Sequence, residues 1–121
     1  MAFWDFLFKP TPKKKIRYKV FQNLEHAEHV IPLKKAVLVE AGKTQICFSR
    51  TPIGLYALED ICPHESKPFH KGSCTENDEI ICPFHRHLID LKSGQNKSHA
   101  GCGKTNVYEV EVSEEGVYVW V

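Results

Sequence analysis

From residue 17 to the C-terminus, apolar residues recur in short runs separated by polar residues and turn-forming sequences. Runs rich in Val, Ile, Tyr and Phe predict strands over 17–21, 36–40, 45–49, 55–58, 79–81, 87–91, 107–112 and 117–121. In the last two runs apolar residues alternate with polar or aromatic ones, which is typical of antiparallel strands with one buried face. Glycine-containing turns separate several of these runs, and only residues 24–30 favour a weak helical turn. We therefore expect an all-β fold whose antiparallel sheets form a sandwich or small barrel.

Length and composition are those of one globular domain. The chain has 121 residues, of which 42% are hydrophobic, and its formal net charge is +1. This balance argues against a polyanion-binding protein, so nucleic acid is not an expected partner. Apolar runs are all shorter than the roughly 18 residues of a membrane-spanning helix, and residues 1–8 lack the basic region of a signal peptide. We expect a soluble, cytoplasmic protein.

The first sixteen residues differ in composition from the rest. Residues 9–19 carry six Lys and Arg without an acid, after an aromatic segment with Phe3, Trp4, Phe6 and Phe8. We interpret residues 1–16 as an N-terminal extension of a domain at 17–121. Two roles stay open: a tail that packs on its own domain or stays mobile, and a hook that docks on a partner subunit or a membrane surface.

Two groupings of cysteine and histidine carry the chemistry. Cys62-Pro63-His64 is followed, after seventeen residues, by Cys82-Pro83-Phe84-His85. The chain has five cysteines, an odd number, and this grouping with histidine favours a metal site over a disulfide framework. Two sulfurs and two nitrogens suit either zinc or an iron–sulfur cluster. In a cluster with two irons, Cys62 and Cys82 would bind one iron while His64 and His85 bind the other.

These residues resemble the signature of the Rieske proteins, Cys-x-His followed by Cys-x-x-His. The resemblance extends to Pro68-Phe69, to Gly72 and to Ser93-Gly94, and it covers roughly residues 17–121. It implies a base of antiparallel sheets with a cluster-binding subdomain inserted at about residues 60–92. It also implies a 2Fe-2S cluster held by Cys62, His64, Cys82 and His85.

Four positions indicate which branch of the family the chain resembles. High-potential members have an additional cysteine in each cluster loop, and a serine and a tyrosine that donate hydrogen bonds to sulfur. Here Glu65-Ser66-Lys67 in the first loop holds no cysteine, and Phe84 occupies the cysteine position of the second loop. His87 stands at the position of the serine and Ile89 at that of the tyrosine. Fewer donors stabilise the reduced cluster less, so the resemblance implies a potential toward the low end of roughly −150 to +300 mV. The chain resembles a Rieske-type ferredoxin.

The resemblance implies a one-electron carrier and not an enzyme. Its expected partners are a reductase as electron donor and an oxygenase, or a similar oxidoreductase, as acceptor. A dinucleotide-binding fingerprint is absent from the sequence, and 121 residues leave no room for a catalytic oxygenase domain. Two alternatives stay open: a small Rieske subunit of a larger oxidoreductase, similar to the nitrite reductase small subunit, and a structural zinc module.

Other cysteines and histidines are expected to lie outside the site. Cys47 belongs to a strand and is expected to be a small buried apolar residue. Cys74 and Cys102 could form a bridge, although free thiols are favoured in a reducing cytoplasm. We expect His70 and His87 to be solvated loop histidines and not alternate ligands.

Overall fold

A computed structural model describes residues 15–61, 68–84, 86–98 and 104–121. Its elements, in chain order, are β1 (Arg17–Phe21), α2 (Leu24–Val30), β2 (Ala36–Ala41), β3 (Thr44–Arg50), β4 (Leu55–Glu59), β5 (Ser73–Cys74), β6 (Glu79–Ile81), β7 (Leu88–Asp90), β8 (Val107–Ser113) and β9 (Gly116–Trp120). Within these residues, every pair of neighbouring strands is antiparallel. The expected all-β fold is confirmed.

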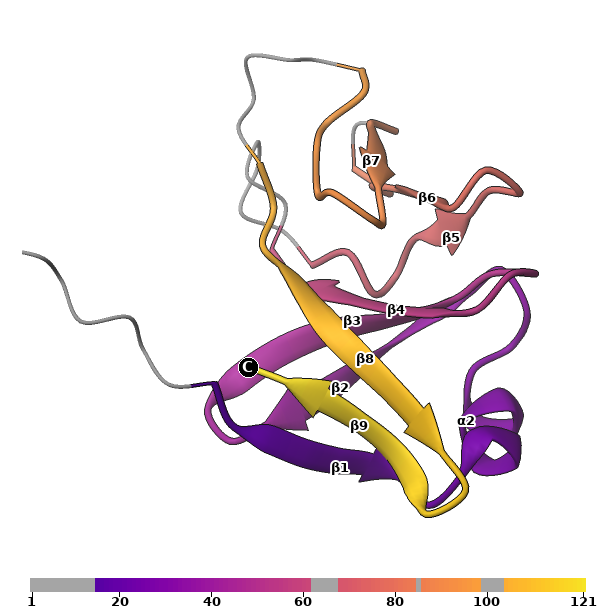
Figure 1. The fold of residues 1–121 in the computed structure, drawn as a ribbon. Coiled ribbons are helices and arrows are strands. Elements are labelled where there is room, and N and C mark those ends of the chain that lie inside the picture. The colour runs from indigo at the N-terminus through magenta and orange to yellow at the C-terminus, as the bar shows by residue number, and fades with distance from the viewer. Residues whose placement is uncertain (1–14, 62–67, 85, 99–103) are drawn as a thin grey trace, which may run out of the picture.

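Six strands form the base of the molecule. Their order is β1-β9-β8-β4-β3-β2 (Figure 1). The sheet curves so strongly that its two edge strands, β1 and β2, come into contact, which gives an open half-barrel. The half-barrel is filled by buried apolar side chains from several strands and from the helix, among them Phe21, Ile31, Ile46, Phe48 and Val119.

A second sheet of three strands, in the order β5-β6-β7, lies above the base in Figure 1. These strands lie between β4 and β8 in the sequence, yet β4 and β8 pair directly, with Leu58 opposite Val107. Two contacts tie β5 to the segment that precedes β2: a β-bridge between Lys35 and Ser73, and a hydrogen bond of 2.8 Å from Cys74 N to Lys34 O.

The two sheets share a second apolar cluster. It combines Cys47 and Leu58 of the base with buried residues of the smaller sheet and its loops, namely Phe69, Cys74, Ile80, Cys82, Ile89 and Leu91. The burial of these side chains between the two sheets holds the sheets together as one packed unit.

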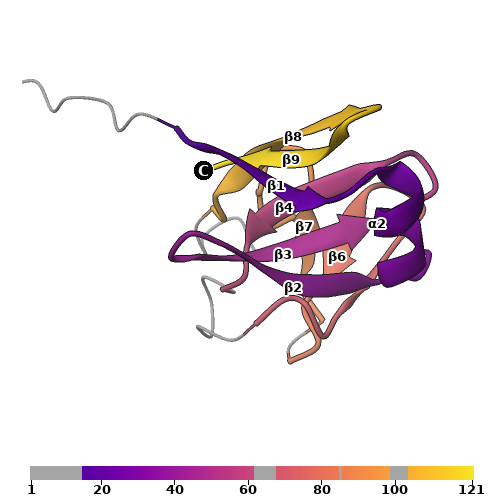
Figure 2. The ribbon, with the colours of Figure 1, turned by 90° about the horizontal axis from the view of Figure 1, so that it is seen from below.

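Helix α2 lies at one end of the base (Figures 1 and 2). The Asn23 side chain caps it by accepting a hydrogen bond of 2.7 Å from His26 N, and Ala27 is its buried residue. The expected weak turn is therefore a helix of 7 residues. All eight predicted strands are present with ends shifted by at most one residue, whereas β5 was not predicted.

Candidate metal centre

Cys82 begins the tight turn that follows β6. Cys82 N donates a hydrogen bond of 2.9 Å to His87 O, and Arg86 N donates one of 2.7 Å to Cys82 O. Arg86 has a φ of 58°, the left-handed conformation that lets the chain reverse here. The Cys82 side chain is fully buried. The turn therefore fixes a thiol at the inner edge of the smaller sheet, while His85 lies outside the described residues.

The first ligand grouping, with Cys62 and His64, also lies outside the described residues. Its two flanks are joined by a bridge that the sequence did not reveal. Asp60, whose side chain is 2% exposed, accepts a hydrogen bond of 2.8 Å from His70 N and one of 2.6 Å from His70 Nδ1. Phe69 beside it is fully buried. Asp60 and His70 thus fix the two ends of the segment that carries this grouping.

The prediction of a solvated loop histidine was wrong for His87. His87 is only 7% exposed, and its Nδ1 lies 3.0 Å from Asn96 Nδ2. The His70 side chain is 25% exposed and pairs with the buried Asp60. Both partners lie nine or ten residues away along the chain, so a loop pattern alone did not indicate them.

Two thiols outside the turn are free and buried, as expected for Cys47 and favoured for Cys74. Burial raises the pKa of Cys74 to about 11, and it raises the pKa of Cys47 further. Both are therefore protonated and unreactive at neutral pH. Cys102, the other half of the considered bridge, lies outside the described residues.

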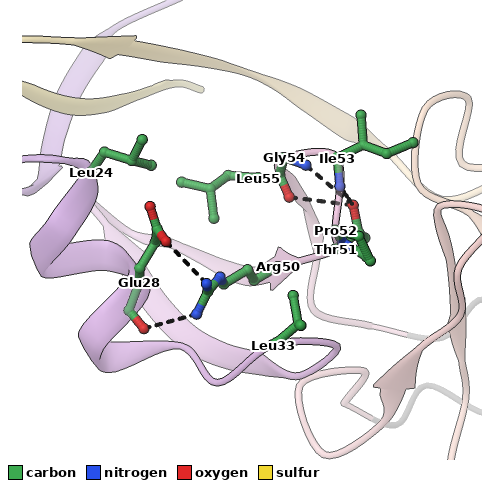
Figure 3. A pocket seen from close by; sticks show the side chains of 9 residues that line it. All are labelled: Leu24, Glu28, Leu33, Arg50, Thr51, Pro52, Ile53, Gly54 and Leu55. Carbon is green, nitrogen blue, oxygen red and sulfur yellow. Dashed lines mark hydrogen bonds and ion pairs between the residues drawn. The ribbon is translucent and has the colours of Figure 1, made fainter.

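A hollow of about 190 Å³ lies on the base beside α2. Figure 3 shows that Arg50 lies among its apolar lining residues, which include Leu24, Leu33 and Leu55. The Arg50 guanidinium donates hydrogen bonds of 3.0 Å to the Glu28 carboxylate and 3.0 and 3.1 Å to the Glu28 and Ile31 carbonyl oxygens. Arg50 therefore holds the end of α2 against β3 and has a structural role.

Within the described residues, no group of three or more His, Cys, Asp or Glu side chains could hold a metal ion. Of the four ligands predicted from the sequence, only Cys82 lies in the described residues. Cys82 fits a cluster, because its sulfur lies at the end of a strand, is shielded from water and sits in a turn closed by backbone hydrogen bonds. Two thiolates and two imidazoles are the donor set of a two-iron cluster.

A model of the Rieske [2Fe-2S] domain matches residues 21–116. The chain belongs to this family. A 2Fe-2S cluster is accordingly the cofactor of this Rieske protein.

Its relatives include ferredoxins of oxygenase systems. The Rieske protein is 33% identical over 78 residues to ferredoxin CarAc of Metapseudomonas resinovorans, covering 64% of this chain and 72% of the relative. A solved complex of reduced oxygenase and oxidised ferredoxin in carbazole 1,9a-dioxygenase matches with a TM-score of 0.70 and 28% identity, over 86% of this chain and 92% of the other.

A further solved structure is assigned as the NADH-dependent nitrite reductase small subunit of Mycobacterium tuberculosis. It matches with a TM-score of 0.76 over 90% of this chain and 97% of the other, at 15% identity. At this identity the likeness concerns the fold alone.

None of the helices in the described residues is long and apolar enough to cross a membrane.

Proposed function

We propose that this protein is a Rieske ferredoxin, a one-electron carrier that receives an electron from a reductase and passes it to an oxygenase or a similar acceptor. The observation that carries the proposal is the buried Cys82 at the start of a closed turn, in a chain of the Rieske family. The ferredoxin relative and the ferredoxin–oxygenase complex support the same partners. We also propose that it works in the cytoplasm.

Four residues are proposed as ligands: Cys62 and Cys82 as thiolates, His64 and His85 as neutral imidazoles. When bound, the cluster supplies reversible one-electron chemistry. The chain's own part is to hold the ligands still and to exclude water. Cys82 is fixed by two backbone hydrogen bonds, and the Asp60–His70 bridge ties the flanks of the first grouping. A preorganised ligand set limits rearrangement when the electron arrives.

We also propose the division of the chain given by its sequence: an extension at 1–16, a Rieske domain at 17–121 and a cluster-binding subdomain at about 60–92. The insertion of β5–β7 between the paired strands β4 and β8 supports this division.

The test is iron and acid-labile sulfide content, with visible absorption and electron paramagnetic resonance of the dithionite-reduced protein, on material purified without oxygen. About two irons and two sulfides per chain, with the rhombic signal of a His-ligated cluster, are expected. Cys82→Ala should lose metal, sulfide and colour. Cys74→Ala, which also removes a buried thiol but not a proposed ligand, should keep all three. One zinc without sulfide would overturn the proposal in favour of a structural zinc module.

A second candidate is a small subunit of a larger oxidoreductase, because the nitrite reductase subunit has the same fold and the chain covers 97% of it. The two candidates differ in whether the protein forms a transient or a permanent complex with its partner. A carrier purifies alone and exchanges between partners, whereas a subunit co-purifies with its large chain through salt washes. Affinity purification of the full chain at native expression level separates the two.

A further inference from the structure

Beside the turn of Cys82, three basic residues from distant parts of the sequence line one hollow of about 190 Å³. Lys35 lies just before β2, Lys71 precedes β5, and Arg86 belongs to the turn itself. Pro83, the residue after Cys82, forms part of the same wall. The β-bridge between Lys35 and Ser73 brings the first two segments together. The packing of the two sheets thus places three cations beside the turn that begins at Cys82, one of the proposed ligands.

Within residues 15–61, 68–84, 86–98 and 104–121, no acidic side chain neutralises these three cations. All three are exposed, and in the described part of the chain none of their side chains has an ion pair. Neighbouring lysines differ, since each has an acid as its partner: Lys34 with Glu76 at 2.9 Å, Lys92 with Asp78 at 3.6 Å and Lys97 with Glu79 at 2.6 Å.

As far as the described residues show, the hollow therefore concentrates positive charge that no carboxylate compensates. Like charges held together at an exposed site raise the local potential and attract anionic groups.

The turn between β8 and β9 carries the exposed acids Glu114 and Glu115, and Figure 1 shows this turn at the far end of the base from β5–β7. Exposed Lys19 of β1 lies against Gly116 beside this turn, so these acids have a base next to them. The lining of the hollow, by contrast, contains three bases and no carboxylate. An acidic partner is therefore attracted to the side of the molecule that carries the turn of Cys82.

The surroundings of the hollow fit a protein surface better than a small anion. Its three cations are exposed and no buried donor forms a closed pocket for a single ligand. Next to it, Pro83 is exposed and Phe84 is 40% exposed. An apolar, aromatic centre with charges around it is the usual composition of a protein–protein interface.

We propose that this basic hollow, formed by Lys35, Lys71 and Arg86, receives carboxylate side chains on the acidic surface of the protein that accepts the electron. This inference rests on the proposed function and names the charge of the partner. Its main effect is on the rate of association, because exposed ion pairs add little affinity while steering can raise on-rates about 10-fold or more.

The test uses two haem proteins as acceptors, acidic cytochrome b5 and basic cytochrome c. In each reaction one electron passes from the reduced holoprotein to one ferric haem, which becomes ferrous, and stopped-flow absorbance gives the rate. At low ionic strength, about 10 mM, Lys35→Gln/Lys71→Gln/Arg86→Gln should reduce cytochrome b5 about 10-fold more slowly than the wild type, and the gap should close at about 200 mM. Reduction of cytochrome c should become faster.

A control variant carries the same change of charge elsewhere. Lys15→Gln/Lys19→Gln/Lys43→Gln alters three exposed lysines, which lie before β1, in β1 and in the β2–β3 turn. This variant should slow the reduction of cytochrome b5 by less than about 3-fold. Lys35→Gln/Lys71→Gln leaves the turn of Cys82 unchanged and should show an intermediate loss. Equal losses in both triple variants, or a loss that salt does not remove, would overturn the inference.

The two levels of the proposal fail differently. A wild-type protein without a cluster signal that reduces neither cytochrome overturns the proposed function, and the docking surface with it. A protein that reduces both cytochromes, with the same salt dependence in the hollow variant as in the control, keeps the proposed function and removes only the docking surface. A redox titration of each variant shows whether its potential equals that of the wild type, so that rates compare docking alone.

Discussion

The bridge between Asp60 and His70 should control how long the cluster is retained. His70→Ala removes the hydrogen bond of 2.6 Å to a carboxylate that is 2% exposed, and leaves that oxygen buried without its partner. A hydrogen bond to a charged group contributes about 1.5–3 kcal/mol. The backbone bond of 2.8 Å from His70 N to Asp60 stays, so the segment loses one of its two ties.

If the hydrogen bond between Asp60 and His70 must break before the cluster is lost, removing it lowers the activation barrier for cluster loss by about 1.5–3 kcal/mol. Since about 1.4 kcal/mol is tenfold in rate, cluster loss should accelerate about 10- to 100-fold. The assay is the decay of visible absorption at a fixed urea concentration without oxygen. Freshly purified His70→Ala should have the spectrum of the wild type, because His70 is not a proposed ligand.

His29→Ala is the matched control. It also replaces a histidine by alanine, and His29 is exposed on α2, far from the site. It should leave the decay unchanged. Equal decay in the two variants would refute the role of the bridge. A colourless His70→Ala protein would show instead that His70 is a ligand and that the ligand assignment is wrong.

Three further predictions concern the scaffold. Gly72→Ala should prevent stable folding, since its Cβ would lie 2.1 Å from Ile81 O, whereas Gly54→Ala, with nothing within 4 Å, should shift the urea midpoint only slightly. The hydrogen bond from Lys97, and to a smaller extent the one from Thr75, lowers the pKa of Glu79. The ionised Glu79 side chain therefore stabilises the fold at any pH above the ordinary pKa of glutamate. The stability difference between wild type and Glu79→Gln, from urea unfolding, should vanish as the pH falls through that lowered pKa. Cys74, with a pKa of about 11, should resist iodoacetamide at pH ~8 until the protein is unfolded.

Much of the base could be predicted from the sequence because its strands are long enough to show a period. The sequence alternates over residues 107–112 and 117–121, and the turn of Glu114 and Glu115 between these runs is local, so the β8–β9 hairpin needs no distant information. Strand β5 has two residues, Ser73 and Cys74, and exists through its pairing with β6. A pattern of two residues has no period, so β5 was not predicted.

The site divides in the same way. The ligand motif is a local spacing that can be read directly, whereas the roles of the neighbouring residues depend on which segments meet. His70 and His87 appear in the sequence as polar loop residues, and only the structure shows their hydrogen-bond partners, Asp60 and Asn96. Similarly, Lys35 and Lys71 are 36 positions apart and become neighbours only when β5 packs beside the start of β2.

The pairing of β4 with β8 makes the cluster-binding part of the chain removable in principle. Glu59 N donates a hydrogen bond of 2.8 Å to Asn106 O, so the chain leaves the base and re-enters it at adjacent points. A short hairpin loop could join these points and excise everything between. The excised base would expose Leu58 and Cys47, which now pack against the smaller sheet, and would need polar replacements there. The same geometry allows the reverse experiment, in which a different ligand-binding insert is transplanted onto an unchanged half-barrel.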